Sequence, residues 1–80
     1  MPDLEQLRVV FRQSLELPPD TPVDELEYRG IDKWDSLAHM ALVAALEQAF
    51  DVMIDTDDVL AISSFGQARK VLERQGVEFR

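Results

Sequence analysis

The sequence contains no cysteine and only one histidine among its 80 residues. Without cysteine the chain has no disulfide framework, no thiolate nucleophile and no zinc site of the cysteine type. It also lacks an apolar run long enough to span a bilayer. Its first residues, MPDLEQLRVV, do not have the charged-then-apolar layout of a signal peptide. We therefore expect a cytoplasmic protein that does not insert into membranes.

Basic residues are scarce, because eight Lys and Arg stand against 16 Asp and Glu and give a formal net charge of −8. A surface with this charge repels nucleic acid and anionic membranes, and it steers toward basic patches on other proteins. We therefore expect protein partners and no nucleic acid.

The chain is also short, and 80 residues leave no room for a second core or a separate catalytic lobe. Apolar residues make up 46% of the composition, which is enough for a globular core despite the charge. We predict one domain over residues 1–80, acting as a monomer.

The spacing of apolar and capping residues predicts an all-α fold, a small four-helix antiparallel bundle with a long first loop and a short third helix. The first helix is expected to begin after Asp3, with Gln6 as its capping-box partner, and to end before Pro18. Its apolar positions are Leu4, Leu7, Phe11 and Leu15.

Three prolines and a glycine in LPPDTPVDELEYRGIDKW forbid a continuous helix, so residues 16–34 are predicted to be mostly loop. A loop this long in a small domain is usually tethered or functional. The expected tethers into the core are Leu26, Tyr28 and Ile31.

The second helix is predicted over about residues 36–50, where apolar residues recur at helical spacing. Leu37 and Met40 lie on a flank that adjoins this apolar stripe. The stripe itself, which we expect to be core, is formed by Leu42, Val43, Leu46 and Phe50.

Two further helices are predicted after a linker from which Val52 and Ile54 pack inward. The first is short and is capped by Asp55 or Thr56, with acids in its first turn that complement the helix dipole. The last helix has Ser64 as N-cap and ends at Gly76. Its apolar face comprises Phe65, Ala68, Val71 and Leu72.

Asp35, Ser36 and His39 are the residue types of a hydrolytic triad, but they lie within five consecutive positions at the start of one helix. A triad needs convergent groups around a pocket with oxyanion donors, and the chain offers no second wall for one. We therefore interpret His39 as a partly buried polar residue with a hydrogen bond at the helix start, and we expect no catalytic residues.

Four aspartates between Asp51 and Asp58 invite comparison with a calcium-binding loop. That motif needs a glycine at its sixth position and a glutamate at its twelfth, and counted from Asp55 these positions hold Leu60 and Gly66. The acids are better explained by helix capping and solvation, so no metal site is predicted.

Ser36 has two possible roles at the start of the second helix. It could be the N-cap, but Asp35 could serve the same purpose. If Asp35 is the cap, the Ser36 hydroxyl is free and projects from a helix N-terminus whose amides and dipole favour a phosphate. A group attached there through a phosphodiester could also carry a thiol, which a chain without cysteine does not have.

The chain resembles an acyl carrier protein. The resemblance is carried by DSL at residues 35–37, which opens a helix continuing AHMALVAALEQAFDV. It extends from about residue 4 to residue 75 and includes the long first loop, the short acidic third helix and the last helix beginning at SSFGQA. A motif of three residues is weak alone, but here it stands in a chain of matching length, charge and helix pattern.

The resemblance implies that Ser36 carries 4'-phosphopantetheine, transferred from coenzyme A by a separate magnesium-dependent phosphopantetheinyl transferase. The terminal thiol would hold acyl groups as thioesters, and the protein would be a carrier and not an enzyme. Its partners would be acyl-transferring or acyl-ligating biosynthetic enzymes. The residues presented to them would be Asp35, Leu37, Met40, Glu47, Asp57 and Asp58. A sequestered acyl chain would contact Leu42, Val43, Leu46, Ile54, Ile62 and Ala68.

The second helix departs from the carriers of housekeeping fatty-acid synthesis, in which it is strongly acidic. Here Glu47 is alone among Ala38, Ala41, Ala45 and Gln48. Trp34 and the sequence WDSLAHMALV more closely resemble stand-alone carriers of specialised pathways, such as polyketide-like, modified-acyl or surface-glycan assembly.

Two alternatives remain. One is an aminoacyl or peptidyl carrier, in which the serine more often follows a histidine than an aspartate. The other is an acidic helical adaptor or inhibitor without a prosthetic group, in which Ser36 is only a helix cap.

Overall fold

The computed structural model describes residues 3–79, so residues 1, 2 and 80 of the predicted domain lie outside the described residues. This part of the chain contains four helices: α1 (Leu4–Ser14), α2 (Ser36–Phe50), α3 (Thr56–Ala61) and α4 (Phe65–Arg74). Its one bridge of β type, between Glu27 and Ser64, is isolated, and residues 3–79 contain no β-strand. The all-α prediction with a long first loop and a short third helix is confirmed.

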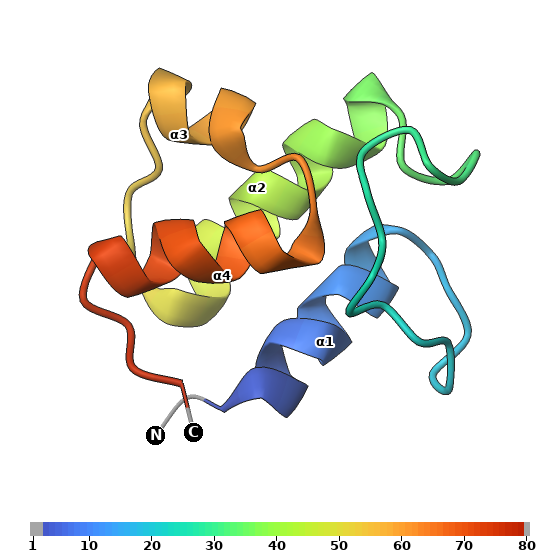
Figure 1. Ribbon diagram of the computed structural model, residues 1–80, viewed down its shortest axis with the longest axis horizontal. Coiled ribbons are helices and arrows are strands. Elements are labelled where there is room, and N and C mark those ends of the chain that lie inside the picture. The colour runs from blue at the N-terminus through green and yellow to red at the C-terminus, as the bar shows by residue number, and fades with distance from the viewer. Residues whose placement is uncertain (1–2, 80) are drawn as a thin grey trace.

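Figure 1 shows how the helices are arranged around the core. Helix α1 runs in the opposite direction to α2, α4 runs obliquely to α1 across the middle of the view, α3 lies at the upper left, and the long first loop lies on the right-hand side. None of the helices in residues 3–79 is long and apolar enough to cross a membrane.

Each helix begins at a side chain that accepts a hydrogen bond from its first turn. Asp3 accepts from Gln6 N, and Ser64 accepts from Gln67 N, as the sequence predicted. At α3 the cap is Asp55, which accepts from Asp58 N. Such bonds satisfy amides that have no partner within the helix, so they define where each helix begins.

The end of α4 also matches the prediction. Helical structure stops at Arg74, and Gly76 follows in the left-handed region with φ of 98°. Glycine adopts this backbone conformation without the steric cost that a Cβ would impose.

The core combines residues of all segments except α3. Its largest fully buried side chains include Trp34, Phe11, Leu7, Leu42 and Leu46. Aromatic rings join the segments, since Phe11 packs edge to face against both Trp34 and Phe65. The predicted tethers Leu26, Tyr28 and Ile31 are half-buried and pack against this core.

Phe50 differs from the prediction, because it is half-buried at the edge of the core and not inside it. It is the last residue of α2, and its ring packs edge to face against Phe79, with ring centroids 5.5 Å apart. The apolar stripe of α2 leaves the core at this point because the helix ends there.

The long loop is held to α1 by two arginines. The Arg8 guanidinium donates two hydrogen bonds to the Asp24 carboxylate, at 2.8 and 3.0 Å. This pairing lowers the pKa of Asp24, with the Arg8 hydrogen bond as the main cause. Arg12 Nε donates to the Thr21 carbonyl at 2.8 Å. The loop therefore has a defined path over the surface of α1.

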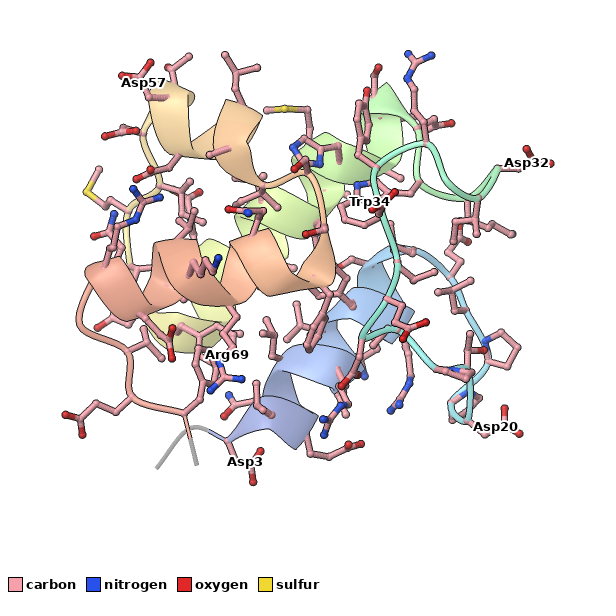
Figure 2. The ribbon with its side chains drawn as sticks, in the orientation of Figure 1. Asp3, Asp20, Asp32, Trp34, Asp57 and Arg69 are labelled. Atoms are coloured by element: carbon pink, nitrogen blue, oxygen red, sulfur yellow. The ribbon has the colours of Figure 1, made fainter. Side chains whose placement is uncertain are left out.

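Trp34 and Val23 are buried loop residues that the sequence analysis did not place in the core, and both are fully inaccessible. Figure 2 shows Trp34 directed inward from the loop, whereas Asp32 projects outward from the same segment. The indole Nε1–H of Trp34 donates to His39 Nδ1 at 3.0 Å, and His39 Nε2 lies 2.9 Å from the Val59 carbonyl oxygen. His39 thereby connects the loop, α2 and α3, which confirms its prediction as a half-buried, hydrogen-bonded residue.

We expect His39→Ala to lower the free energy of unfolding by about 1–3 kcal/mol, because the buried indole N–H of Trp34 would lose its acceptor. His39→Asn retains an acceptor near the Nδ1 position and should recover part of this loss. Urea unfolding followed by the fluorescence of Trp34, the single tryptophan, measures both variants. Wild-type stability in His39→Ala would contradict the proposed contribution of the contact.

Candidate functional site

The candidate site lies where the long loop meets the start of α2. Asp35 is the N-cap of α2, and its carboxylate accepts from Ala38 N at 2.9 Å. Ser36 is the first residue of the helix. Of the two possibilities left open by the sequence, Asp35 is therefore the cap, and the Ser36 hydroxyl is not used for capping.

Ser36 is exposed, and two loop side chains contact its hydroxyl. The Tyr28 hydroxyl lies 2.9 Å from Ser36 Oγ, and Arg29 Nη2 donates to the same oxygen at 3.3 Å. The hydrogen bond between the Tyr28 and Ser36 hydroxyls is the main cause that holds the pKa of the Tyr28 phenol below its ordinary value, and the adjacent Arg29 guanidinium lowers it further. The Ser36 oxygen is thus accessible and next to a cation.

The backbone of the loop places these two side chains. Tyr28 N donates to the Ser63 carbonyl at 2.8 Å, which attaches the loop to the connection between α3 and α4. Arg29 N donates to the Trp34 carbonyl at 3.1 Å, and Trp34 is buried in the core. The positions of Tyr28 and Arg29 are therefore set by the tertiary structure.

An open depression lies beside Ser36. It is lined by Arg29, Ile31, Asp32, Trp34, Asp35, Ser36 and Leu37. Its rim carries both signs of charge, with one guanidinium and two carboxylates. A group attached to Ser36 Oγ would begin its path at this depression.

The residues predicted to meet partners occupy different environments. Leu37 and Met40 are exposed apolar side chains on α2, with 82% and 57% of their surface accessible. Asp57 is exposed at the start of α3, as Figure 2 shows, whereas Asp58 is half-buried and accepts from Arg74 at 3.3 Å. Leu60 on α3 is a further exposed apolar residue, at 77%, which the sequence analysis did not single out.

Glu47 is less available than the other predicted contact residues. It is half-buried, and its carboxylate accepts from Ile54 N at 2.9 Å. This hydrogen bond satisfies the backbone of the linker between α2 and α3. Glu47 therefore has a structural contact in addition to any role at the surface.

The structure brings the six candidate acyl-contact residues together in one hydrophobic cluster. All six are buried: Leu42, Val43, Leu46, Ile54, Ile62 and Ala68. A chain that entered between the helices would have to displace packing among these side chains.

The side-chain geometry does not match a hydrolytic triad. Both ring nitrogens of His39 are engaged, by Trp34 and by the Val59 carbonyl, and the Ser36 hydroxyl meets Tyr28 and Arg29 instead. His39 is therefore not positioned to take a proton from Ser36. Among residues 3–79, no group of three or more His, Cys, Asp or Glu side chains is arranged to hold a metal ion.

Four helices, a long first loop and an accessible serine at the start of α2 define the class of fold, a small all-α bundle with an exposed hydroxyl at one helix start. No protein-family model matches the sequence. Among solved structures, the chain is similar to a holo acyl carrier protein from Geobacter metallireducens, determined by solution NMR, with a TM-score of 0.77 and 27% sequence identity. The match covers 94% of this chain and 86% of the other. The chain therefore has the acyl carrier protein fold, and this similarity supports a carrier role in general.

The sequence analysis missed that Tyr28 and Arg29 reach Ser36, since it treated Tyr28 only as a core tether and did not consider Arg29. One signal was present in the composition. Between residues 13 and 68 the sequence has just two basic residues, Arg29 and Lys33, and both lie within seven positions of Ser36. This local excess of basic residues in an acidic chain could have drawn attention to the loop before Ser36, although of the two only Arg29 contacts the Ser36 hydroxyl.

Proposed function

We propose that this protein carries acyl intermediates as thioesters on 4'-phosphopantetheine attached to Ser36 Oγ, and that it shuttles them between biosynthetic enzymes. The observation that carries this proposal is the exposed Ser36 hydroxyl, which Asp35 leaves free from capping, at the start of α2 in an acyl carrier fold. We further propose that residues 1–80 act as one domain and as a monomer.

The residues at Ser36 fit the attachment of a phosphodiester. A phosphopantetheinyl transferase would join Ser36 Oγ to the phosphorus of the pantetheine phosphate, while the bond to the nucleotide part of coenzyme A breaks and the hydroxyl proton leaves to a base. The arm supplies the thiol that the cysteine-free chain lacks. The chain's own part is to present Oγ to the transferase on a fixed helix start and to place Tyr28 and Arg29 beside it.

Partner enzymes would recognise the surface formed by α2, α3 and the residues next to Ser36. Exposed Leu37 and Met40 offer apolar contact, while Asp35, Asp57 and Asp58 offer negative charge. Apolar contacts contribute affinity, whereas complementary charge mainly raises the association rate and selects among partners. The matching surfaces would be basic and apolar patches on acyl-transferring or acyl-ligating enzymes. Glu47 on α2 would be a further acidic contact of this protein.

The test is to incubate the folded protein with coenzyme A and a promiscuous phosphopantetheinyl transferase and to measure its intact mass. We expect a gain of one phosphopantetheinyl group. After acylation of the thiol, neutral hydroxylamine should remove the acyl mass, because it cleaves thioesters. A folded protein that gains no mass would favour the adaptor alternative, and an aminoacyl cargo would be distinguished by which ligating enzyme loads the arm.

The sparse acids of α2 lead to a prediction about partner choice. We expect the fully modified protein to be a poor substrate for a housekeeping ketosynthase, and Ala38→Glu/Ala41→Glu/Gln48→Glu to raise its turnover by increasing the association rate. Ala41 and Gln48 are exposed and Ala38 is half-buried, so the new charges would lie on or near the surface. The gain should shrink with added salt, because exposed charges are screened.

The control is a variant with the same net charge but with its acids away from α2, Gln6→Glu/Gln67→Glu/Gln75→Glu, since these three glutamines are exposed. Steady-state ketosynthase turnover with acylated carriers at low and high ionic strength compares the three proteins. If wild type and the α2 variant are turned over equally at low salt, the missing acids do not determine partner choice.

A further inference from the structure

Arg29 is the cation nearest to the proposed attachment atom. Its Nη2 lies 3.3 Å from Ser36 Oγ, and its Cζ lies 5.5 Å from the centroid of the Tyr28 ring, over the ring face. A cation–π contact attracts the guanidinium to the face of the ring and so restricts its position. The guanidinium is thus oriented toward Ser36 before any group is attached there.

The backbone at Arg29 has a conformation that it shares with only two other non-glycine residues of the described chain, Glu16 and Asp51. Arg29 has φ of 64°, in the left-handed region, although glycine occupies the next position and does not have a positive φ. A residue with a Cβ adopts this region at an energetic cost that glycine avoids. The hydrogen bond from Arg29 N to the Trp34 carbonyl, at 3.1 Å, maintains the strained conformation. The strained position therefore holds a residue whose side chain reaches Ser36.

The depression beside Ser36 contains one guanidinium and two carboxylates before any group is attached. A serine hydroxyl is neutral and does not require a cation, whereas a phosphodiester carries a full negative charge across the physiological pH range. Asp32 and Asp35 line the same depression and would repel that charge. A phosphodiester on Ser36 would thus be an anion next to Arg29, the one cation among the residues that line the depression.

We base the following inference on the proposed function. We propose that Arg29 is the positioning residue for the phosphodiester on Ser36. Its guanidinium pairs with the non-bridging oxygens of the phosphodiester and thereby orients the first segment of the arm. The Tyr28 hydroxyl, 2.9 Å from Ser36 Oγ, is the second donor to the same group. Guanidinium suits this role because its planar set of N–H donors matches two oxygens of a phosphate.

The experiment compares apo and holo forms of wild type, Arg29→Gln and Arg29→Lys. In wild type, conversion to the holo form should raise the melting temperature through the new ion pair, and Arg29→Gln should lose about 2 to 6 °C of this holo-minus-apo difference. Arg29→Lys, which keeps the charge but not the planar donors, should recover part of it. The ³¹P resonance of the holo protein should shift in Arg29→Gln relative to wild type.

Lys33→Gln is the matched control, because it removes the same charge in the same loop. Lys33 lines a neighbouring depression that shares Asp32, Asp35 and Leu37 with the one beside Ser36, but it is Arg29 and not Lys33 that contacts Ser36 Oγ. Lys33→Gln should leave both the holo-minus-apo difference and the ³¹P resonance as in wild type. If Lys33→Gln and Arg29→Gln change these values equally, the effect is one of net charge and the assignment of Arg29 is wrong.

Two outcomes separate this inference from the proposed function. If wild type takes up no phosphopantetheine, the proposed function and the inference fall together. If wild type is loaded but its Arg29 Nε–Hε resonance is unchanged between apo and holo forms, only the assignment of Arg29 is overturned. This last measurement uses wild type alone, so it decides the question even if Arg29→Gln is loaded poorly.

Discussion

Ser36→Ala is expected to abolish the uptake of phosphopantetheine completely, because it removes the oxygen that forms the phosphodiester. The variant should remain folded. The N-cap bond of α2 comes from Asp35 and not from Ser36, so the substitution removes no capping interaction. Intact mass after incubation with coenzyme A and transferase measures the uptake, and circular dichroism measures the fold.

Ser63→Ala is the matched control, since Ser63 is also exposed and lies in the connection between α3 and α4. It should be modified to the same extent as wild type. A second comparison is Asp35→Ala, which should remain modifiable yet lose about 0.5–2 kcal/mol of stability with its cap. Uptake by Ser36→Ala would mean that the attachment site is another residue.

Leu46→Ala is expected to cost about 2–5 kcal/mol of the free energy of unfolding. Leu46 is fully inaccessible in the middle of the core, so its truncation leaves a cavity that the neighbouring helices cannot fully close. Small domains have only about 5 kcal/mol or little more in total. The variant should therefore be largely unfolded by circular dichroism at 25 °C, or have a much lower urea midpoint.

Phe50→Ala provides the comparison within the same helix. Because Phe50 is half-buried and packs at the edge against Phe79, its truncation should cost less than that of Leu46 despite the larger side chain removed. The urea midpoints of the two variants give this order directly. The reverse order would mean that the end of α2 contributes more to the core than its exposure indicates.

The helix starts could be predicted from the sequence because they depend on local chemistry. Asp3, Asp35, Asp55 and Ser64 each accept from an amide three residues later, and the spacing of apolar residues defines the buried face of the helix that follows. The serine at the start of α2 could be found for the same reason. The choice between Asp35 and Ser36 as the cap of α2, and between Asp55 and Thr56 as the cap of α3, needed the structure.

The surroundings of Ser36 could not be predicted in the same way, because they depend on contacts between distant segments. Arg29 reaches the site from a left-handed backbone that no helical or strand pattern indicates. The path of the loop is set by pairing of Glu27 with Ser64 and by burial of Trp34, which are tertiary contacts. Residues that act through loop geometry are therefore the part of this site that sequence periodicity does not reveal.

Helix α3, which carries part of the proposed recognition surface, contributes no fully buried side chain to the core. The structure describes all six residues of α3, Thr56–Ala61, and none of them is buried. Ile54 before the helix and Ile62 after it are both buried. Its contacts to other helices include the hydrogen bonds from His39 to Val59 and from Arg74 to Asp58. Displacing α3 between these two anchored ends would break these polar contacts and uncover the half-buried Val59 and Ala61, but would remove no buried residue from the core, so it would cost less than unfolding. We therefore expect α3 to move more readily than the rest of the bundle, so that the same core could offer differently shaped surfaces to the proposed partner enzymes.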